Sequence, residues 1–221
     1  RTGYFSARNP DYPRLLRCAS HLKLTCSESR PMTDARHPHI LRREDTLLVV
    51  VDMQEPFLRG IHDHERLVAN VRLLIESAAI MQVPVIPTVQ YAERMGGIVP
   101  EVTQAFADFT TCVPIDKLCF SCVGAEGFLD GIASFGRPQI LLCGVETHIC
   151  VSQTALDLTS QGYQVHVAAD AVSSRSLEKH KLGMERMRDS AVLPCASEAA
   201  VYELLREAGT PEFKAILALV K

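Results

Sequence analysis

Apolar positions along residues 45–221 recur with two different spacings. Short, nearly continuous apolar runs, such as TLLVVV at residues 46–51, are typical of strands that are buried on both faces of a sheet. Longer segments, such as residues 63–81, carry apolar side chains three and four positions apart, which predicts amphipathic helices. Strands are expected at 46–51, 83–88, 111–117, 138–144, 164–169 and 191–193. Helices are expected at 63–81, 100–108, 125–134, 150–161, 176–188, 197–208 and 211–220.

The order of these elements predicts the fold class. Strands alternate with helices, and such alternation favours a parallel sheet that is covered on both faces. We therefore expect an α/β protein with a doubly wound, mostly parallel six-stranded sheet in the strand order 3-2-1-4-5-6. No GxGxxG or Walker sequence follows an expected strand, so nothing in the pattern indicates a nucleotide or another cofactor.

Residues 1–44 lack this pattern. They hold four prolines and scattered arginines, and we interpret them as a basic, loosely ordered extension that precedes a domain at 45–221. Residues 1–43 carry nine Lys/Arg and three Asp/Glu, a net charge of +6. That charge permits phosphate contacts, but no basic motif interleaved with aromatic residues appears, so nucleic acid is not the expected partner. The Arg/Ser content also resembles a mitochondrial transit peptide, although the prolines oppose the amphipathic helix that such a peptide forms.

The composition suits one globular domain with a sizeable core. The chain has 221 residues, 47% of them hydrophobic, and a net charge of −3. No apolar run approaches the roughly 20 residues of a membrane span. The eight cysteines follow no regular spacing, and a chain of this length can build its core without disulfides, so we expect a cytoplasmic protein with reduced thiols. Cys119 and Cys122 form a CxxC pair, but no second pair of ligands with zinc-site spacing accompanies it.

The segment GVETHICV at residues 144–151 is the most informative in the chain. It follows an apolar strand pattern and precedes apolar positions at helical spacing, which predicts a strand, a tight turn and a helix. Cys150 is then expected at or near the helix start, where backbone N–H groups and the helix dipole favour a thiolate. Asp52 ends the first expected strand, and in the strand order above it meets the end of the fourth strand, beside Cys150.

Three segments in this order resemble the isochorismatase-like cysteine hydrolases, and within them the isochorismatase domain-containing proteins of eukaryotes. They are VVDMQEPF at 50–57, DKLCFS at 116–121 and GVETHICV at 144–151. The resemblance runs from about residue 47 to the C-terminus. It implies a small-molecule substrate and a homo-oligomer, a dimer or a tetramer, and the short apolar runs predict no membrane association.

The resemblance also implies a catalytic triad of Asp52, Lys117 and Cys150. Asp52 would take the proton of the thiol as general base, and Lys117 would hold the carboxylate and stabilise the thiolate. The backbone N–H groups of Glu146 and Cys150 would bind the oxyanion, and the bond between Val145 and Glu146 is expected to be cis. The remaining pocket residues would be Gln54, Phe57, Tyr91, Phe120 and Thr147.

The chain departs from two members of this superfamily. Nicotinamidases bind a metal through an Asp-x-His motif after the second strand, where this chain has TVQY at 88–91, so no metal ligands are expected. True isochorismatases lack the nucleophilic cysteine that Cys150 would supply. We therefore expect a metal-independent hydrolase of a small amide or related C–N bond that works through a thioester. The alternative is a catalytically silent interaction protein that keeps the fold.

Overall fold

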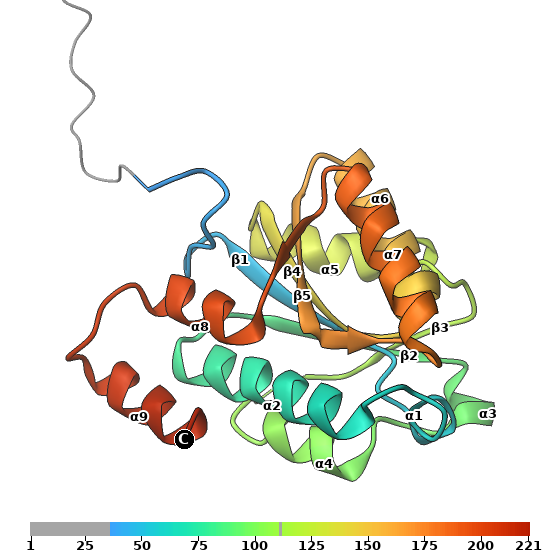
Figure 1. Cartoon of the computed structure of the whole chain (residues 1–221), viewed down its shortest axis with the longest axis horizontal. Helices are drawn as coiled ribbons and strands as arrows, with labels where there is room; N and C mark the ends of the chain where they lie inside the picture. Colours follow the sequence, from blue (N-terminus) through green and yellow to red (C-terminus); the bar gives the residue numbers. More distant parts are fainter. Residues whose placement is uncertain (1–35, 111) are drawn as a thin grey trace, which may run out of the picture. The chain divides into compact units, whose positions relative to one another are not determined.

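Six parallel strands form the centre of the protein in this computed structural model, which describes residues 36–110 and 112–221. The strand order is β3-β2-β1-β4-β5-β6, as the sequence predicted (Figure 1). The strands are β1 (Thr46–Val51), β2 (Val85–Gln90), β3 (Ile115–Lys117), β4 (Gln139–Val145), β5 (Gln164–Ser173) and β6 (Leu193–Cys195). The most central pair, β1 and β4, is joined in register from Thr46 opposite Gln139 to Val51 opposite Gly144.

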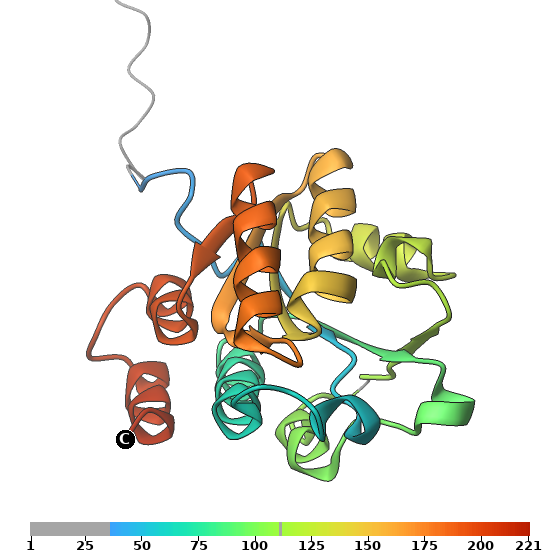
Figure 2. The same ribbon diagram turned by 45° about the vertical axis from the view of Figure 1, so that its right-hand side comes forward.

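Helices cover both faces of the sheet, and the two groups are separate in both ribbon views (Figures 1 and 2). One face carries α2 (His64–Ile80), α4 (Pro100–Thr103), α8 (Ser197–Leu205) and α9 (Pro211–Leu219). The other carries α5 (Phe128–Phe135), α6 (Ser152–Ser160) and α7 (Leu177–Asp189). Short elements complete the described chain: α1 (Glu55–Leu58), α3 (Ala92–Met95), the 3₁₀ turns η1 (Gln104–Phe106) and η2 (Cys122–Gly124), and the π-helical turn η3 (Thr147–Val151).

The continuous apolar run of β1 follows from this double cover. All six residues of the strand are buried. Leu48 and Val50 pack in the core beneath α2 and α8, whereas Leu47 and Val49 pack in the core beneath α5, α6 and α7. Because successive side chains of a strand point to opposite faces, a strand covered on both sides is apolar at every position.

Several expected element boundaries differ from those in the structure. The last strand lies two residues later than the expected 191–193, because Ala191 adopts a positive φ of 64° and Val192 donates its backbone N–H to Met187, which places both in the turn that ends α7. The helix expected at 150–161 begins only at Ser152, as α6. The third strand is confined to the last three residues of its expected range.

The compact unit of the structure runs from residue 37 to residue 221, and Leu41 is fully buried in its core. Most of the expected extension, residues 1–35, lies outside the described residues, and with it the possible transit peptide. Among the described residues, no helix has the length and apolar character needed to cross a membrane.

Candidate active site

Asp52 lies at the carboxyl end of β1, where the chain leaves the sheet. Its φ is 51°, in the left-handed region that Asp tolerates better than most residues. The carboxylate is almost fully buried, and both of its oxygens are bonded. Thr88 Oγ1 donates to Oδ1 at 2.8 Å, and Lys117 Nζ donates to Oδ2 at 2.6 Å. These two bonds fix the plane of the carboxylate.

Lys117 ends β3, two strands away from Asp52 in the sheet. Its side chain is fully buried, and Nζ also contacts Gln90 Oε1 at 2.6 Å and the carbonyl oxygen of Cys119 at 3.4 Å. Burial opposes the ammonium charge, but the charge of Asp52 and its hydrogen bond outweigh burial and raise the pKa of Lys117. Lys117 is therefore a cation whose three donors are all directed at protein oxygens.

Cys150 lies in η3, directly before α6 begins, so it is near the helix start, as expected, but within a π turn and not within α6 itself. The carbonyl oxygen of Glu146 accepts from the N–H groups of both Ile149 and Val151, so the chain makes a wide π turn before α6 begins. The apolar side chains that predicted the helix, Val151, Ala155 and Leu158, are all buried and fit either arrangement. The Val145–Glu146 peptide bond, which leads into the turn, is cis.

Gly144 brings the Cys150 turn close to the end of β1. It adopts a φ of 108°, and a β-carbon at this position would lie 2.1 Å from the carbonyl oxygen of Val51. Only glycine fits both the backbone conformation and the space. Residue 51 immediately precedes Asp52, so this close approach links the two segments that carry the carboxylate and the thiol.

The thiol of Cys150 is neutral in this environment. Burial first, and then the charge and hydrogen bonding of Asp52, raise the pKa of Cys150 to about 12, although Lys117 acts in the opposite direction. Burial and Asp52 therefore oppose the thiolate that backbone N–H groups near a helix start would favour. The arrangement instead places a protonated thiol beside a potential proton acceptor.

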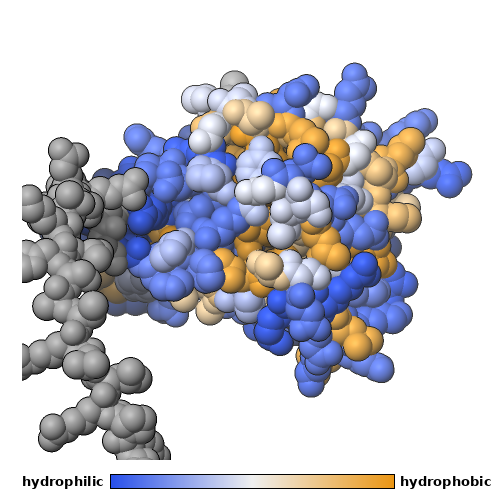
Figure 3. Space-filling view, turned by 90° about the horizontal axis from the view of Figure 1, so that it is seen from above, coloured by the Kyte–Doolittle hydropathy of each residue, from blue (hydrophilic) through white to orange (hydrophobic). Residues whose placement is uncertain are grey.

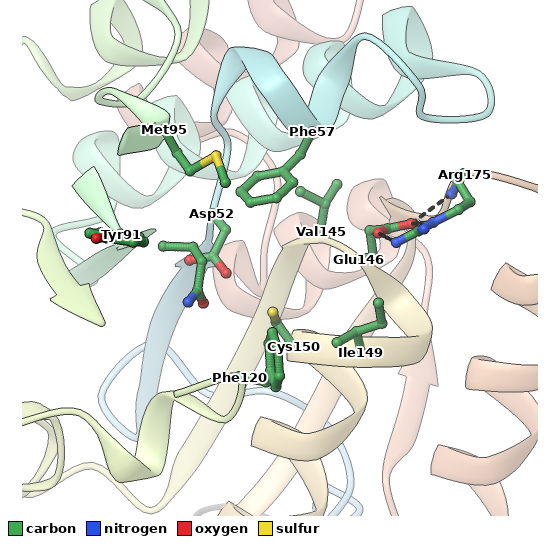
Figure 4. A pocket seen from close by; sticks show the side chains of 11 residues that line it. Asp52, Phe57, Tyr91, Met95, Phe120, Val145, Glu146, Ile149, Cys150 and Arg175 are labelled. Atoms are coloured by element: carbon green, nitrogen blue, oxygen red, sulfur yellow. Dashed lines mark hydrogen bonds and ion pairs between the residues drawn. The ribbon is translucent and has the colours of Figure 1, made fainter. Parts of the chain in front are cut away.

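A cavity of about 230 Å³ opens over these groups (Figure 4). Asp52 and Cys150 line it, whereas Lys117 lies beneath it, behind the carboxylate. The lining residues are Asp52, Phe57, Gln90, Tyr91, Met95, Phe120, Val145, Glu146, Ile149, Cys150 and Arg175. Of the pocket residues expected from the sequence, Phe57, Tyr91 and Phe120 are among them.

Gln54 and Thr147 do not line the cavity, in contrast to the expectation. Gln54 is fully buried, and its amide nitrogen donates to the carbonyl oxygens of Gln90 and Gly96 while its Oε1 accepts the Gln90 N–H. Thr147 is also buried, with its Oγ1 3.0 Å from Nδ1 of His180. Both polar side chains are used to hold the segments that surround the cavity.

Arg175 is a cavity residue that sequence reasoning did not single out. It follows β5 and binds the Glu146 carboxylate through its backbone N–H at 2.9 Å, Nε at 3.1 Å and Nη2 at 2.5 Å. Burial raises the pKa of Glu146, but the hydrogen bonds and charge of Arg175 outweigh burial and lower it overall. No local signal in the sequence identified this pair, because its members are 29 residues apart.

Residues 88–91, the segment that lacks an Asp-x-His metal motif, include Thr88 and Gln90. Thr88 donates to Asp52, and Gln90 accepts from Lys117, so both side chains serve the buried charge pair. Over residues 36–110 and 112–221, no three His, Cys, Asp or Glu side chains are grouped so that they could hold a metal ion.

Comparison with known proteins agrees with this architecture. The family model described as "Isochorismatase domain" matches residues 46–199. The secreted isochorismatase effector Isc1 of Phytophthora sojae is 36% identical over 179 residues, 80% of this chain and 84% of that protein. Human isochorismatase domain-containing protein 2 is 37% identical over 181 residues, 80% of this chain and 83% of that protein.

A solved structure described as MAR1 ribonuclease from Caenorhabditis elegans superimposes with a TM-score of 0.76 at 32% identity. The match covers 81% of this chain and 91% of that one. Sequence and structure thus agree over the region that carries the sheet, the buried Asp52–Lys117 pair and the Cys150 turn. The chain belongs to the isochorismatase domain family and has the α/β fold of its hydrolases.

Proposed function

We propose that this protein is a metal-independent cysteine hydrolase that cleaves a small amide or related C–N bond through a thioester on Cys150. The observation that carries the proposal is the buried contact of 2.6 Å between Lys117 Nζ and Asp52 Oδ2, with Asp52 and Cys150 lining one cavity. A carboxylate held in this way can accept a proton, and the neighbouring ammonium compensates the charge that develops on the sulfur.

In the first half of the reaction, Asp52 takes the thiol proton while the Cys150 sulfur attacks the carbonyl carbon of the substrate. The N–H groups of Glu146 and Cys150 are the proposed donors to the oxyanion. The C–N bond then breaks, and the amine leaves with the proton that Asp52 had accepted. In the second half, water gives a proton to Asp52 and attacks the thioester, and the acid departs as the thiol is restored. The sum is one amide and one water converted to one acid and one amine.

The high pKa of Cys150 is consistent with this sequence of proton transfers. A thiol with a pKa of about 12 supplies almost no thiolate at neutral pH. Deprotonation must therefore accompany the attack, which gives Asp52 a direct role in the rate. Thiol and carboxylate act as one unit in amide cleavage, and neither is expected to turn over an amide alone.

The test is release of ammonia from a panel of small primary amides. Wild-type protein should turn over at least one of them, and Cys150→Ala should not. Cys195→Ala, a change of a cysteine at the end of β6 outside the cavity, serves as the matched control. Mass spectrometry of the wild type with a slow substrate should show one acyl adduct on the intact protein, and peptide mapping should place it on the peptide that contains Cys150.

Two further results would contradict the proposal. Turnover that survives in Cys150→Ala would exclude the thioester, and turnover that is lost with a chelator and restored by a divalent metal would exclude metal independence. Failure to consume any amide, with no adduct on Cys150, would favour the alternative of an interaction protein without catalysis.

Self-association belongs to the same proposal. Exposed apolar side chains lie in the segment after β3 and on α7, among them Leu118, Phe120, Leu177 and Leu182. Figure 3 looks onto the face covered by α5, α6 and α7 and shows apolar surface there among polar side chains. Contact between copies would cover such residues, and a mass of two or four chains by light scattering is the expected result.

A further inference from the structure

The electrical character of the cavity is set by very few groups. Its charged lining residues are Asp52, Glu146 and Arg175, and Lys117 lies behind Asp52. Among the described residues that line it, Arg175 is the only cation. Arg175 is therefore the lining residue that could balance the charge of a negatively charged substrate. Without Arg175, the charge of the substrate would lie near Asp52 with no lining cation to balance it.

Arg175 already forms an ion pair with a carboxylate of the protein itself. Its Nε and Nη2 both contact Glu146, one to each carboxylate oxygen, as Figure 4 shows by the dashed lines between the two side chains. A fork-to-fork pair of this kind uses the geometry with which arginine would otherwise bind a substrate carboxylate. Lys117 likewise donates its hydrogen bonds to protein groups, namely Asp52, Gln90 and Cys119.

The rest of the lining is predominantly apolar. Phe57, Tyr91, Met95 and Phe120 surround the opening in front of the thiol, and Val145 and Ile149 flank it on the Cys150 side (Figure 4). Binding of an apolar group between these side chains is favourable, because it removes apolar surface from water. With about 230 Å³ of space, the cavity fits a short aliphatic or single-ring acyl group.

We infer that the substrate is an uncharged amide with a small apolar acyl group, and that the Glu146–Arg175 pair excludes carboxylate-bearing substrates by neutralising the cavity's cation. This inference rests on the proposed hydrolase function. Glu146 has a specificity role through its side chain, separate from the proposed role of its backbone N–H. The pair sets the charge preference because loss of either member leaves an uncompensated charge at the cavity wall.

Two small alkylating agents that are alike in size and differ in charge provide the test. Iodoacetamide is neutral and iodoacetate is an anion, and both transfer a two-carbon group to a thiol. Their rates at Cys150 are followed by mass spectrometry of the Cys150 peptide and divided by their rates with glutathione under the same conditions. Wild-type protein should disfavour iodoacetate by about tenfold after this correction. An iodoacetate rate equal to or above that of iodoacetamide would overturn the inference.

The two members of the pair give opposite predictions. Glu146→Gln removes the carboxylate and leaves Arg175 as a net cation, so the corrected preference for iodoacetamide should shrink or reverse, by about tenfold. Arg175→Gln leaves Glu146 uncompensated and should increase the preference. Because the Arg175 side chain is 54% exposed, this second variant remains informative if Glu146→Gln does not fold. The same ratio in wild type and a folded variant would overturn the role of the pair.

Substrates complete the experiment. Butanamide and 4-methylbenzamide should be hydrolysed in preference to succinamate and 4-carboxybenzamide, their charged counterparts. Cys150-dependent turnover of the charged amides at equal or higher kcat/KM would overturn the inference and leave the proposed hydrolase standing. No turnover of any amide, combined with selective alkylation by iodoacetamide, would overturn the hydrolase and leave the charge preference of the cavity intact.

Discussion

Gly183 of α7 lies directly against the backbone of His148. A β-carbon at position 183 would be 2.9 Å from both the Cα and the N of His148, closer than real β-carbons approach such atoms. His148 belongs to η3, the turn that carries Cys150. The contact between Thr147 and His180 joins the same two elements. Helix α7 therefore acts as a rigid support for the turn that positions the thiol.

Gly183→Ala should displace this turn. Alanine gains up to about 1 kcal/mol over glycine within a helix, but insertion of a methyl group into a packed contact costs about 1–3 kcal/mol. We expect net destabilisation in urea unfolding and a loss of amide turnover of about tenfold or more, because small displacements of reacting groups are costly.

Gly131→Ala is the matched control for that change. Gly131 also lies within a helix, α5, but its β-carbon would meet only Ile86 Cδ1 at an ordinary contact distance of 3.6 Å. This variant should be as stable as the wild type or more so. Equal turnover in wild type and Gly183→Ala would show that α7 does not position the turn.

Asp52→Asn should separate two properties of Cys150. Besides burial, the Asp52 carboxylate raises the pKa of the Cys150 thiol, so removal of the carboxylate lowers this pKa. The alkylation rate, which increases with pH as the thiol ionises, should then begin to increase at a lower pH. Alkylation by iodoacetamide at pH 8 should therefore become faster. Amide turnover should fall by about 10²–10⁴-fold, because the general base is lost.

The exposed carboxylate of Asp116, next to Lys117 in β3, offers a control for Asp52→Asn. Asp116→Asn should change neither the pH profile of alkylation nor turnover. If Asp52→Asn leaves turnover intact, Asp52 is not the base; if it slows alkylation, its main influence on the thiol is not electrostatic.

Lys117→Met should be strongly destabilising. The change leaves the buried Asp52 carboxylate without its cation, and breaking a buried pair in this way costs about 3–5 kcal/mol. The double variant Asp52→Asn, Lys117→Met should recover part of this loss, since no buried charge then remains. Arg72→Met, which breaks an exposed pair with Glu76, should cost less than about 1 kcal/mol. An equally small effect of Lys117→Met in denaturant titrations would contradict the importance of the buried pair.

His166 should make stability depend on pH in the acid range. It is buried in β5, and burial, followed by the charge of His39, lowers its pKa to about 4. In the unfolded chain, His166 has a pKa near 6.5 and binds the proton more readily than in the folded protein. The contribution of the neutral, buried His166 to stability is therefore fully present above about pH 6.5 and is lost as pH falls towards 4. The loss is on the order of 3 kcal/mol.

His166→Gln should flatten this part of the stability curve relative to the wild type. His64→Gln, at an exposed position of α2, should leave the curve unchanged. Parallel curves for the wild type and His166→Gln between pH 4 and 6.5 would show that His166 does not contribute to the acid dependence.

The sequence by itself determined the elements and their order. The spacing of apolar residues along the chain indicates which side chains are buried. Every residue of β1 is buried, whereas the buried residues of α2 recur three and four positions apart. The alternation of strands and helices then favoured one sheet topology, which placed Asp52 and Cys150 at neighbouring strand ends. The resemblance of three short segments to a known family added Lys117.

Only the tertiary structure decided how the polar groups are paired. Gln54 and Thr147 lie in the same segments as cavity residues, yet their side chains form hydrogen bonds with other protein groups and do not line the cavity. Arg175 enters the cavity because β5 ends beside the Cys150 turn, and the π turn itself depends on a shared carbonyl at Glu146. Hydrogen-bond partners depend on where loops from distant parts of the chain converge, and local periodicity carries no information about that convergence.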